Sequence, residues 1–362
     1  MKVLFVFNHP APYKVELLKR IAPCIDLMVL FERQKNRDRD PRFYQNESLS
    51  FPHRFLKGIA FGKENFLSTE IRKEIKKNHY DLIVMNGYST LAEILAIRYM
   101  IRKKIPYALY VNGGFIHADS AWKYRFKTKL ISHAFRYYAP SKKIDSYLLH
   151  YGARKEDIRY YPYATISEKE IATSPLSKEE KENILQSYHL PTKTPIFISV
   201  GQFIPRKNMM LLLKIFRLHP NLHLLLVGGG KEETKYRQYM EQYHMNNVTI
   251  LPFLPRKQLF PLMRACHSLI LLSKEDIYGH VINEALSQGI GVIASDKIIA
   301  AQTLIQDGVQ GYIVSNQNHD MIHQAIELSL QKSFFDEAIA VAKQNTYEQS
   351  AACHIALWKK EA

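Results

Sequence analysis

The sequence has 362 residues, too many for one ordinary core and enough for two domains of ordinary size. Its 46% hydrophobic and 23% charged residues are an ordinary globular balance. The three cysteines, Cys24, Cys266 and Cys353, are far apart, which excludes a disulfide framework or a cysteine metal site and suits a reducing compartment.

The formal net charge of +16 is unevenly distributed. Residues 1–165 hold 30 Lys and Arg against 15 Asp and Glu, whereas residues 166–362 hold 20 against 19. This asymmetry predicts a polyanionic partner, either nucleic acid or an anionic membrane, unless the basic surface is merely solvated. The apolar start "MKVLFVFNHP" is too short for a signal peptide, and no stretch reaches the ~18 apolar residues of a membrane span. We therefore expect a cytoplasmic protein that is soluble or peripheral.

The first half alternates short apolar runs with amphipathic stretches, which predicts a parallel sheet covered by helices on both faces. The expected strands are residues 2–7, 25–31, 80–87 and 107–114. The expected helices are residues 13–22, 67–78, 90–104 and a helix that ends within 145–152.

A turn- and charge-rich stretch, residues 165–184, has no strand pattern and is the best linker candidate. The alternation then restarts, so we expect two doubly wound α/β halves with a ligand site in the cleft between them. The expected strands are residues 196–201, 222–230, 248–255, 268–273 and 291–296. The expected helices are residues 209–219, 282–289 and the region from about 318 to the C-terminus.

Two strand ends carry motifs suited to phosphates. "SVGQFIPRKN" (199–208) places Arg206 and Lys207 at a helix entrance, where unpaired N–H groups also attract anions, although a solvated basic pair is the alternative. "VGGGKEE" (227–233) has glycines that let a ligand approach the backbone, or that simply make a tight turn. Neither run is a dinucleotide fingerprint or a P-loop.

A third motif, "KEDIYGHVINEALSQG" (274–289), combines two acids with an expected helix that starts near Tyr278 and Gly279. Asp276 lies in the loop, and Glu284 lies about one and a half turns into that helix. Glu284 is placed to bind a pair of vicinal hydroxyls, and Asp276 is placed to bind hydroxyls on the other side of the phosphates. Hydroxyls, phosphates and further hydroxyls in this order describe a sugar nucleotide. The alternative is an ordinary surface helix with acids near its N-terminus.

Over residues 195–315 the order of these motifs resembles the C-terminal half of the family 4 retaining glycosyltransferases, including an Asp-Gly-x-x-Gly run at Asp307, Gly308 and Gly311. Three positions depart from the family pattern. Asp276 stands where the family usually has its first Glu, Gln202 stands where an Arg is common, and Gly291 stands where a Pro is usual. The first half resembles the family more loosely, through "NHPAPYKVELLKRIA" and "VNGGFIHADS". His117 in the latter matches a histidine that contacts the donor sugar in family members, or is a solvated loop residue.

The resemblance implies the GT-B fold, with two Rossmann-like domains facing across a cleft and a C-terminal helix that crosses back to the first domain. The expected parts are an acceptor-binding domain (1–165), a linker (166–190), a nucleotide-sugar domain (191–345) and the returning helix (346–362). It also implies retaining transfer from a nucleotide-diphosphate sugar, with UDP as the expected nucleotide, and no metal or other cofactor. The expected acceptor is a lipid-linked saccharide in cell-surface polysaccharide or capsule synthesis. The alternatives are a soluble acceptor, a GT-B sugar-nucleotide epimerase, and a basic nucleic-acid-binding protein, although no nucleic-acid module is recognisable.

The site residues follow from the motifs and the resemblance. The expected catalytic residues are Lys207, Arg206, Asp276 and His117. The expected donor-binding residues are Gly201, Gln202, Gly229, Phe253, Ile277, Tyr278, Gly279, His280 and Glu284. The acceptor-side candidates are His9, Tyr13, Asn86, Asn112 and Gly113.

The stretch "SAWKYRFKTKLISHAFRYYAPSKK" (120–143) interleaves cations with aromatic residues. Read as one helix, it has the composition favoured at a lipid interface, unless Trp122 and Phe126 are core residues. We therefore expect the first domain to bind an anionic membrane on the inner face of the cell. The expected membrane-facing residues are Trp122, Lys123, Arg125, Phe126, Lys127 and Lys129, with Tyr124, Phe135 and Arg136 in the same stretch.

Overall fold

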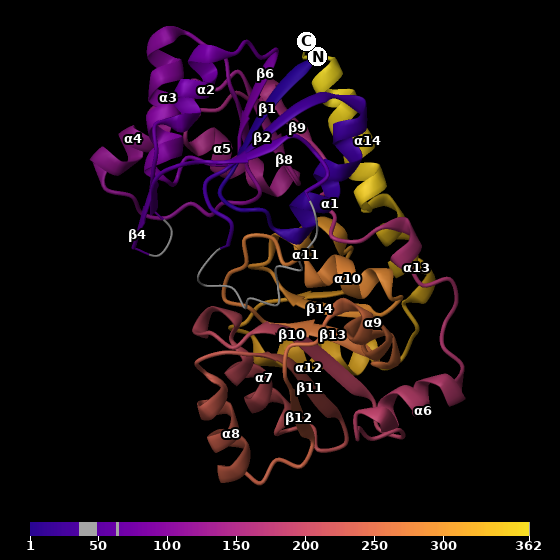
Figure 1. Cartoon of the computed structure of the whole chain (residues 1–362). Helices are drawn as coiled ribbons and strands as arrows, with labels where there is room; N and C mark the ends of the chain where they lie inside the picture. Colours follow the sequence, from indigo (N-terminus) through magenta and orange to yellow (C-terminus); the bar gives the residue numbers. More distant parts are fainter. Residues whose placement is uncertain (36–48, 63–64, 362) are drawn as a thin grey trace. The chain divides into compact units, whose positions relative to one another are not determined.

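A computed structural model describes residues 1–35, 49–62 and 65–361 of the chain (Figure 1). The chain forms two compact units, one of residues 1–164 with 346–362 and one of residues 165–345. The segment 166–190, which the sequence suggested as a linker, lies within the second unit. It carries helix α6 (Lys178–Ser187), which packs against α9 (Arg256–Ala265).

In the described part of the first unit, seven parallel strands form a sheet of order β3-β2-β1-β6-β7-β8-β9. The order reverses between β1 and β6, so this half is doubly wound as expected. The strands are β1 (Lys2–Phe7), β2 (Asp26–Phe31), β3 (His53–Phe55), β6 (Leu82–Met85), β7 (Ala108–Tyr110), β8 (Arg136–Ala139) and β9 (Ile158–Tyr160). The sequence did not predict β3, or the antiparallel hairpin of β4 (Ile59–Phe61) and β5 (Asn65–Leu67).

Helix α3 of the first unit begins at a side-chain cap. Thr90 and Glu93 form a capping box at the start of α3, so each side chain binds a backbone N–H of the first turn. The helices are α1 (Pro12–Ile21), α2 (Glu70–Lys77), α3 (Leu91–Lys103), α4 (Ala121–Ile131), α5 (Asp145–His150) and α14 (Tyr347–Lys359).

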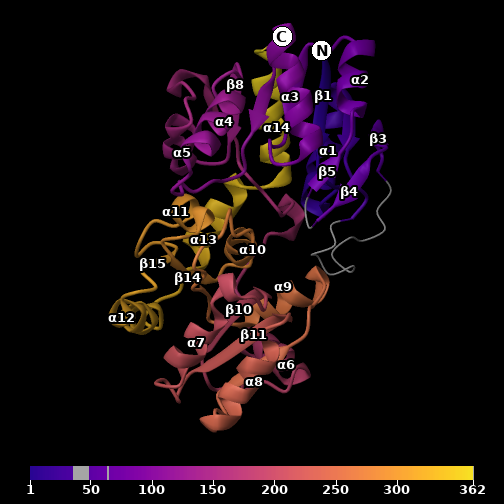
Figure 2. The ribbon, with the colours of Figure 1, turned by 90° about the vertical axis from the view of Figure 1, so that its left-hand side faces the viewer.

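The last helix, α14, packs against α1, and both turned views show it beside the strands of this unit (Figures 1 and 2). Trp358 of α14 is fully buried, with its ring centroid 5.6 Å from that of Phe5 on β1. Arg20 of α1 forms an ion pair with Glu348 at 3.0 Å. These contacts join the two ends of the sequence in one core.

The reading of residues 120–143 as one helix is wrong. Helix α4 ends at Ile131, and the chain then enters strand β8, which includes Arg136. Arg136 forms ion pairs with Asp157 at 3.0 Å and Glu361 at 2.7 Å, so this cation serves the fold of the unit.

The second unit, all of which is described, contains a six-stranded parallel sheet of order β12-β11-β10-β13-β14-β15. The order reverses between β10 and β13, which confirms the second doubly wound half. The strands are β10 (Ile196–Gln202), β11 (His223–Gly229), β12 (Val248–Leu251), β13 (Ser268–Leu271), β14 (Gly291–Ser295) and β15 (Gly311–Val314). Besides α6 and α9, the helices are α7 (Met209–Phe216), α8 (Glu233–Gln242), α10 (Val281–Ser287), α11 (Ile299–Leu304), α12 (His319–Ser329) and α13 (Phe335–Gln344).

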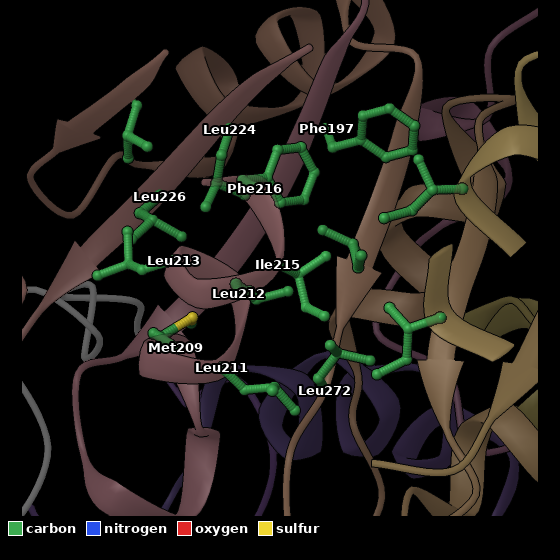
Figure 3. Close-up of a cluster of buried hydrophobic side chains, with 14 of the residues drawn as sticks. Phe197, Met209, Leu211, Leu212, Leu213, Ile215, Phe216, Leu224, Leu226 and Leu272 are labelled. Carbon is green, nitrogen blue, oxygen red and sulfur yellow. The ribbon is translucent and has the colours of Figure 1, made fainter. Parts of the chain in front are cut away.

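A buried apolar cluster holds α7 against the second sheet (Figure 3). Phe197 of β10 and Phe216 of α7 are fully buried, with ring centroids 5.6 Å apart. Each such ring contributes ~2–3 kcal/mol on burial, which fixes the start of α7 relative to the carboxyl ends of the strands.

Candidate active site

The carboxyl ends of β10 and β13 lie side by side at the point where the order of the second sheet reverses. Strand β10 pairs with β13 at Phe197–Ser268 and Ile198–Leu269, so the loops that follow the two strands are neighbours. The loop after β10 carries Arg206 and Lys207, and the loop after β13 carries Asp276. Ligands of doubly wound sheets bind at such a reversal, so this edge is the candidate site.

Arg206, Lys207 and Asp276 form one ionic cluster, which we call the donor-side cluster. Lys207 Nζ donates to Asp276 Oδ2 in a short ion pair, and Arg206 Nη1 lies 3.2 Å from Asp276 Oδ1. The Lys207 and Asp276 side chains are only 12% and 11% exposed, whereas that of Arg206 is 42% exposed. Two cations against one carboxylate leave a local excess of positive charge, as a bound diphosphate would require.

The cluster keeps Asp276 ionised. Burial alone would raise the pKa of the Asp276 carboxyl, but the adjacent Lys207 and Arg206 outweigh burial and hold that pKa below its ordinary value. Arg206 is itself fixed, since its Nη1 donates to the carbonyl oxygen of Glu275 at 2.7 Å.

Glycines bring the backbone close to this cluster. A Cβ on Gly201 would lie 3.9 Å from Lys207 Nζ, so the lysine lies over the end of β10. A Cβ on Gly228 would lie only 2.0 Å from the Gly201 carbonyl oxygen, so the strand ends approach closely only because residue 228 has no side chain. Gln202 and Gly229 pair across β10 and β11 at the same edge.

The helix that follows Asp276 starts later than the sequence suggested. It begins at Val281, with His280 as its N-cap, and Glu284 therefore lies in its first turn, not one and a half turns into it. Gly279 causes the delay, because its φ of +92° is not helical and a Cβ there would lie 2.5 Å from Ile298 Cγ2.

The residues between Asp276 and α10 differ in exposure. Ile277 is 57% exposed, whereas Tyr278 is 3% exposed and stacks obliquely on His280 with ring centroids 5.1 Å apart. Burial raises the pKa of Tyr278, so its hydroxyl stays protonated. Phe253, in the loop after β12, is half-buried.

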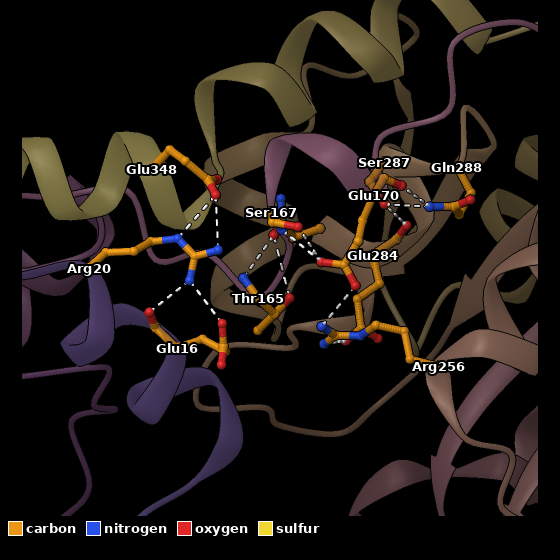
Figure 4. Close-up of polar contacts among 11 residues, drawn as sticks. Glu16, Arg20, Thr165, Ser167, Glu170, Arg256, Glu284, Ser287, Gln288 and Glu348 are labelled. Atoms are coloured by element: carbon orange, nitrogen blue, oxygen red, sulfur yellow. Dashed lines mark hydrogen bonds and ion pairs between the residues drawn. The ribbon is translucent and has the colours of Figure 1, made fainter. Parts of the chain in front are cut away.

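Glu284 has a partner that sequence reasoning missed. Arg256 Nη2 donates to Glu284 Oε1 at 3.0 Å, and Arg256 Nη1 lies 3.4 Å from Glu170 Oε1 (Figure 4). Arg256 is the first residue of α9, where the helix dipole disfavours a cation without acidic partners, but nothing in the sequence marks Glu284 as its partner. A ligand hydroxyl on Glu284 would have to share this carboxylate with Arg256.

In the first unit, three polar side chains meet beyond the strand ends. Asn112 Nδ2 donates to Asn86 Oδ1 at 3.1 Å, and Tyr161 OH donates to Asn112 Oδ1 at 2.7 Å. The other sequence candidates are spread around this edge. His9 is buried, Tyr13 has its ring centroid 5.8 Å from that of Tyr163, Gly113 is half-buried, and His117 is exposed in the loop after β7.

A buried carboxyl pair lies at the same edge and was not anticipated. Glu32 follows β2, its side chain is fully buried, and its Oε1 accepts a short hydrogen bond from Thr90 Oγ1. Glu93 Oε2 accepts from the backbone N–H groups of Ser89 at 2.9 Å and Thr90 at 3.2 Å. Burial, and then the charge of Glu93, raise the pKa of Glu32 to about 8.

Helix α4 presents a smaller basic face than the sequence suggested. Lys123 and Lys127 form ion pairs with Asp119, at 3.2 and 2.8 Å, which hold the preceding loop on the helix. Trp122, Arg125, Phe126 and Lys129 share one face by helical spacing, and we call them the α4 outer face. Of these, Trp122 is 72% exposed, Arg125 and Lys129 are exposed, and Phe126 is half-buried, so Trp122 is not a core residue.

Among the described residues, no group of three or more His, Cys, Asp and Glu is arranged to hold a metal ion. In the same part of the chain, no helix combines the length and apolar character needed to cross a bilayer.

Comparison with known proteins finds a family match for the second unit. Residues 180–349, which include the donor-side cluster and Glu284, match the family model described as glycosyl transferases group 1. Residues 180–349 of this chain are thus similar to the group 1 glycosyltransferases. A relative described as an uncharacterized glycosyltransferase, YqgM of Bacillus subtilis, is 31% identical over 156 residues, which are 38% of this chain and 42% of the relative. The lipopolysaccharide core biosynthesis glycosyltransferase LpsE of Rhizobium meliloti is 25% identical over 138 residues, covering 38% of this chain and 40% of its own length.

This chain thus aligns with well under two thirds of the length of either curated relative. Solved structures match more of it. The crystal structure of Anabaena Alr3699/HepE in complex with UDP superposes with a TM-score of 0.80 over 100% of both chains, at 19% identity. At that identity the match shows the fold, which is GT-B, as the motifs implied.

Proposed function

We propose that this glycosyltransferase moves a sugar, with retention, from a UDP-linked donor to a lipid-linked saccharide during cell-surface polysaccharide synthesis. The observation that carries the proposal is the donor-side cluster at the reversal of the second sheet. A diphosphate leaving group gains negative charge as the sugar departs, and preorganised cations stabilise that charge without reorganisation.

The cluster suggests an exchange of partners on donor binding. In the free protein the ammonium group of Lys207 is neutralised by Asp276. The diphosphate would take over Lys207 and Arg206, and the released Asp276 carboxylate would accept hydroxyl groups of the transferred sugar. The three side chains therefore serve both ends of one nucleotide sugar.

UDP as the nucleotide is supported by structural relatives. The Anabaena protein has been solved with UDP and with UDP-glucose, and it shares the fold of this chain. We propose that Glu284 binds the ribose of UDP and that the loop of Phe253 contacts the base. We also propose that the reaction needs no metal, because Lys207 and Arg206 supply the positive charge.

The lipid-linked acceptor is supported by charge and by the α4 outer face. Trp122, Arg125 and Lys129 expose an aromatic ring and two cations on a unit whose first 165 residues hold 30 basic against 15 acidic residues. Each cation near an anionic leaflet contributes ~1 kcal/mol, so this face supports weak, salt-sensitive attachment to the inner surface of the cell membrane. LpsE, a relative, is named for lipopolysaccharide core biosynthesis, which also builds on a lipid.

The test is a panel of nucleotide sugars, assayed for release of nucleoside diphosphate with and without polyprenyl-linked saccharides. We expect a UDP-sugar to be used, release to rise with the lipid-linked acceptor, and chelators to have no effect. The anomeric configuration of the product, read by NMR, checks retention. No release from any donor, with Lys207→Ala as the background control, would contradict the proposal.

A further inference from the structure

The second unit has a groove on the side of α7 and α12, made of two adjoining cavities. The larger, of about 720 Å³, is lined by the start of α7 and by the residues that follow β13, β14 and β15. The smaller, of about 520 Å³, lies between α7, α8 and α12. Lys214 and His319 line both cavities, so they form one continuous groove, which we call the α7 groove.

The α7 groove adjoins the donor-side cluster without including its side chains. Lys274 N donates to the Arg206 carbonyl oxygen at 2.9 Å, and Asp276 N donates to the Lys297 carbonyl oxygen at 3.0 Å. Neither Lys207 nor Asp276 lines it, and neither does Glu284. Its volumes are in the range of small-ligand sites, so it is large enough for a ligand of its own.

The groove is basic and rich in polar groups that suit hydroxyls. Its walls carry four cations, Lys214, Arg217, Lys274 and Lys297, against one carboxylate, Asp296. Asp296 is already paired with Lys297 at 3.1 Å, which leaves Lys214, Arg217 and Lys274 without a carboxylate among the lining residues. The larger cavity adds amide and hydroxyl side chains from Asn208, Ser315, Asn316 and Gln317.

The smaller cavity adds aromatic surface. The ring centroids of Tyr239 and Tyr243 lie 4.6 Å apart, and the Arg217 guanidinium carbon lies 4.4 Å from the ring centroid of Tyr243. Tyr243 is 41% exposed and Leu218 is 62% exposed, so apolar surface borders the cations. Rings of this kind bind the flat apolar face of another ring, while the guanidinium binds anionic groups.

We propose that the α7 groove binds an acidic saccharide chain, a second ligand distinct from the nucleotide sugar. Spaced carboxylates or phosphates would bind Lys214, Lys274 and Arg217, sugar hydroxyls would bind the amide side chains, and one sugar ring would pack on the tyrosine pair. A nucleic acid fits less well, because residues 166–362 are nearly neutral, with 20 basic and 19 acidic residues, and supply no extended basic surface. The proposal rests on the proposed glycosyltransferase function, because the acidic saccharide chain would be the substrate or the product of the sugar transfer.

The test is calorimetry on the full chain with three probes: an acidic hexasaccharide (hexagalacturonate), a neutral one (maltohexaose) and the oligonucleotide (dT)6. We expect hexagalacturonate to bind at least fivefold more tightly than the other two. Lys214→Ser with Arg217→Ser, and separately Tyr243→Ser, should each weaken it at least fivefold. The matched control, Lys235→Ser with Lys257→Ser, removes two exposed lysines of the same unit outside the groove and should change affinity less than twofold.

Equal losses in the groove and control variants, equal binding of maltohexaose, or tighter binding of (dT)6 would each overturn the proposal. UDP affinity of every variant should match that of the parent, since the groove lies outside the donor-side cluster. Binding is measured without turnover, so the result for the groove proposal is independent of the result for the proposed transferase function. If the parent chain releases no nucleotide from any donor but the groove variant still binds hexagalacturonate more weakly than the parent, the groove proposal stands and the proposed transferase function fails.

Discussion

The buried carboxyl pair of Glu32 and Glu93 makes the stability of the first unit depend on pH. Glu32 Oε2 has no hydrogen-bond partner in the described part of the chain, and Arg33 Nη2 is 3.9 Å away. Ionising Glu32 therefore puts a second negative charge beside Glu93 in a buried position. Glu32→Gln removes the titrating group and keeps an oxygen for the hydroxyl of Thr90.

The magnitude follows from linkage between protonation and folding. The pKa of Glu32 is raised from its ordinary 4.5 to about 8, so between these values the folded state holds one more proton than the unfolded state. Unfolding free energy must then fall as pH rises, by ~1.4 kcal/mol per pH unit for this one group. Glu32 is already half ionised at pH 8, so between pH 6 and pH 8 the parent should lose ~2 kcal/mol relative to Glu32→Gln.

Urea denaturation followed by tryptophan fluorescence measures this loss. Both tryptophans, Trp122 and Trp358, belong to the first unit, so the signal reports that unit. The control is Glu156→Gln, which removes a side chain of the same unit that is 70% exposed. The reasoning is refuted if the difference in unfolding free energy between the parent and Glu32→Gln is the same at pH 6 and pH 8 to within about 0.5 kcal/mol. It is also refuted if Glu156→Gln changes the pH dependence as Glu32→Gln does.

Four further predictions concern the donor site and the membrane. Lys207→Ala should lower kcat about 100-fold or more with an unchanged melting temperature, because it removes charge stabilisation from the leaving diphosphate, and full turnover would place the donor elsewhere. Asp276→Glu restores the acid usual in the family and should keep activity within about tenfold, whereas complete loss would show a site adapted to the shorter acid. Glu284→Gln should weaken UDP binding about tenfold by calorimetry, and unchanged affinity would remove Glu284 from the ribose site. Replacing Trp122 and Arg125 with Ser should reduce co-sedimentation with anionic liposomes at low salt, and equal binding to neutral liposomes would argue against an electrostatic membrane face.

The sequence was sufficient for the central strands of both sheets, because these are apolar runs separated by amphipathic helices. Strands β10 and β11 each have seven residues, and most of them are buried. Residues 136–139 had no such signature. The charge of Arg136 is neutralised by Asp157 and by Glu361, which lies 225 positions away, and that distant partner cannot be read from a local pattern.

The candidate site was predictable where it depends on strand ends and less so where it depends on side-chain partners. The topology brings Lys207 and Asp276 together although 69 positions separate them, because the loops that carry them follow neighbouring strands. The link from Arg256 to Glu284 depends on how α9 packs against α10, which no spacing in the sequence encodes. The burial of Glu32 could not be predicted either, because the residues that surround it belong to the first turn of α3.

The return of α14 to the first unit has a consequence for the order in which the chain folds as it leaves the ribosome. Residues 1–164 emerge before the second unit, but Trp358, which contacts Phe5 and Tyr138, is made only after residue 345. Domains that are continuous in sequence can close as soon as they emerge. Here the second unit is complete at residue 345, while the first still exposes the apolar surface that α14 will cover. During synthesis, the unit whose residues are made first therefore completes its fold after the second unit.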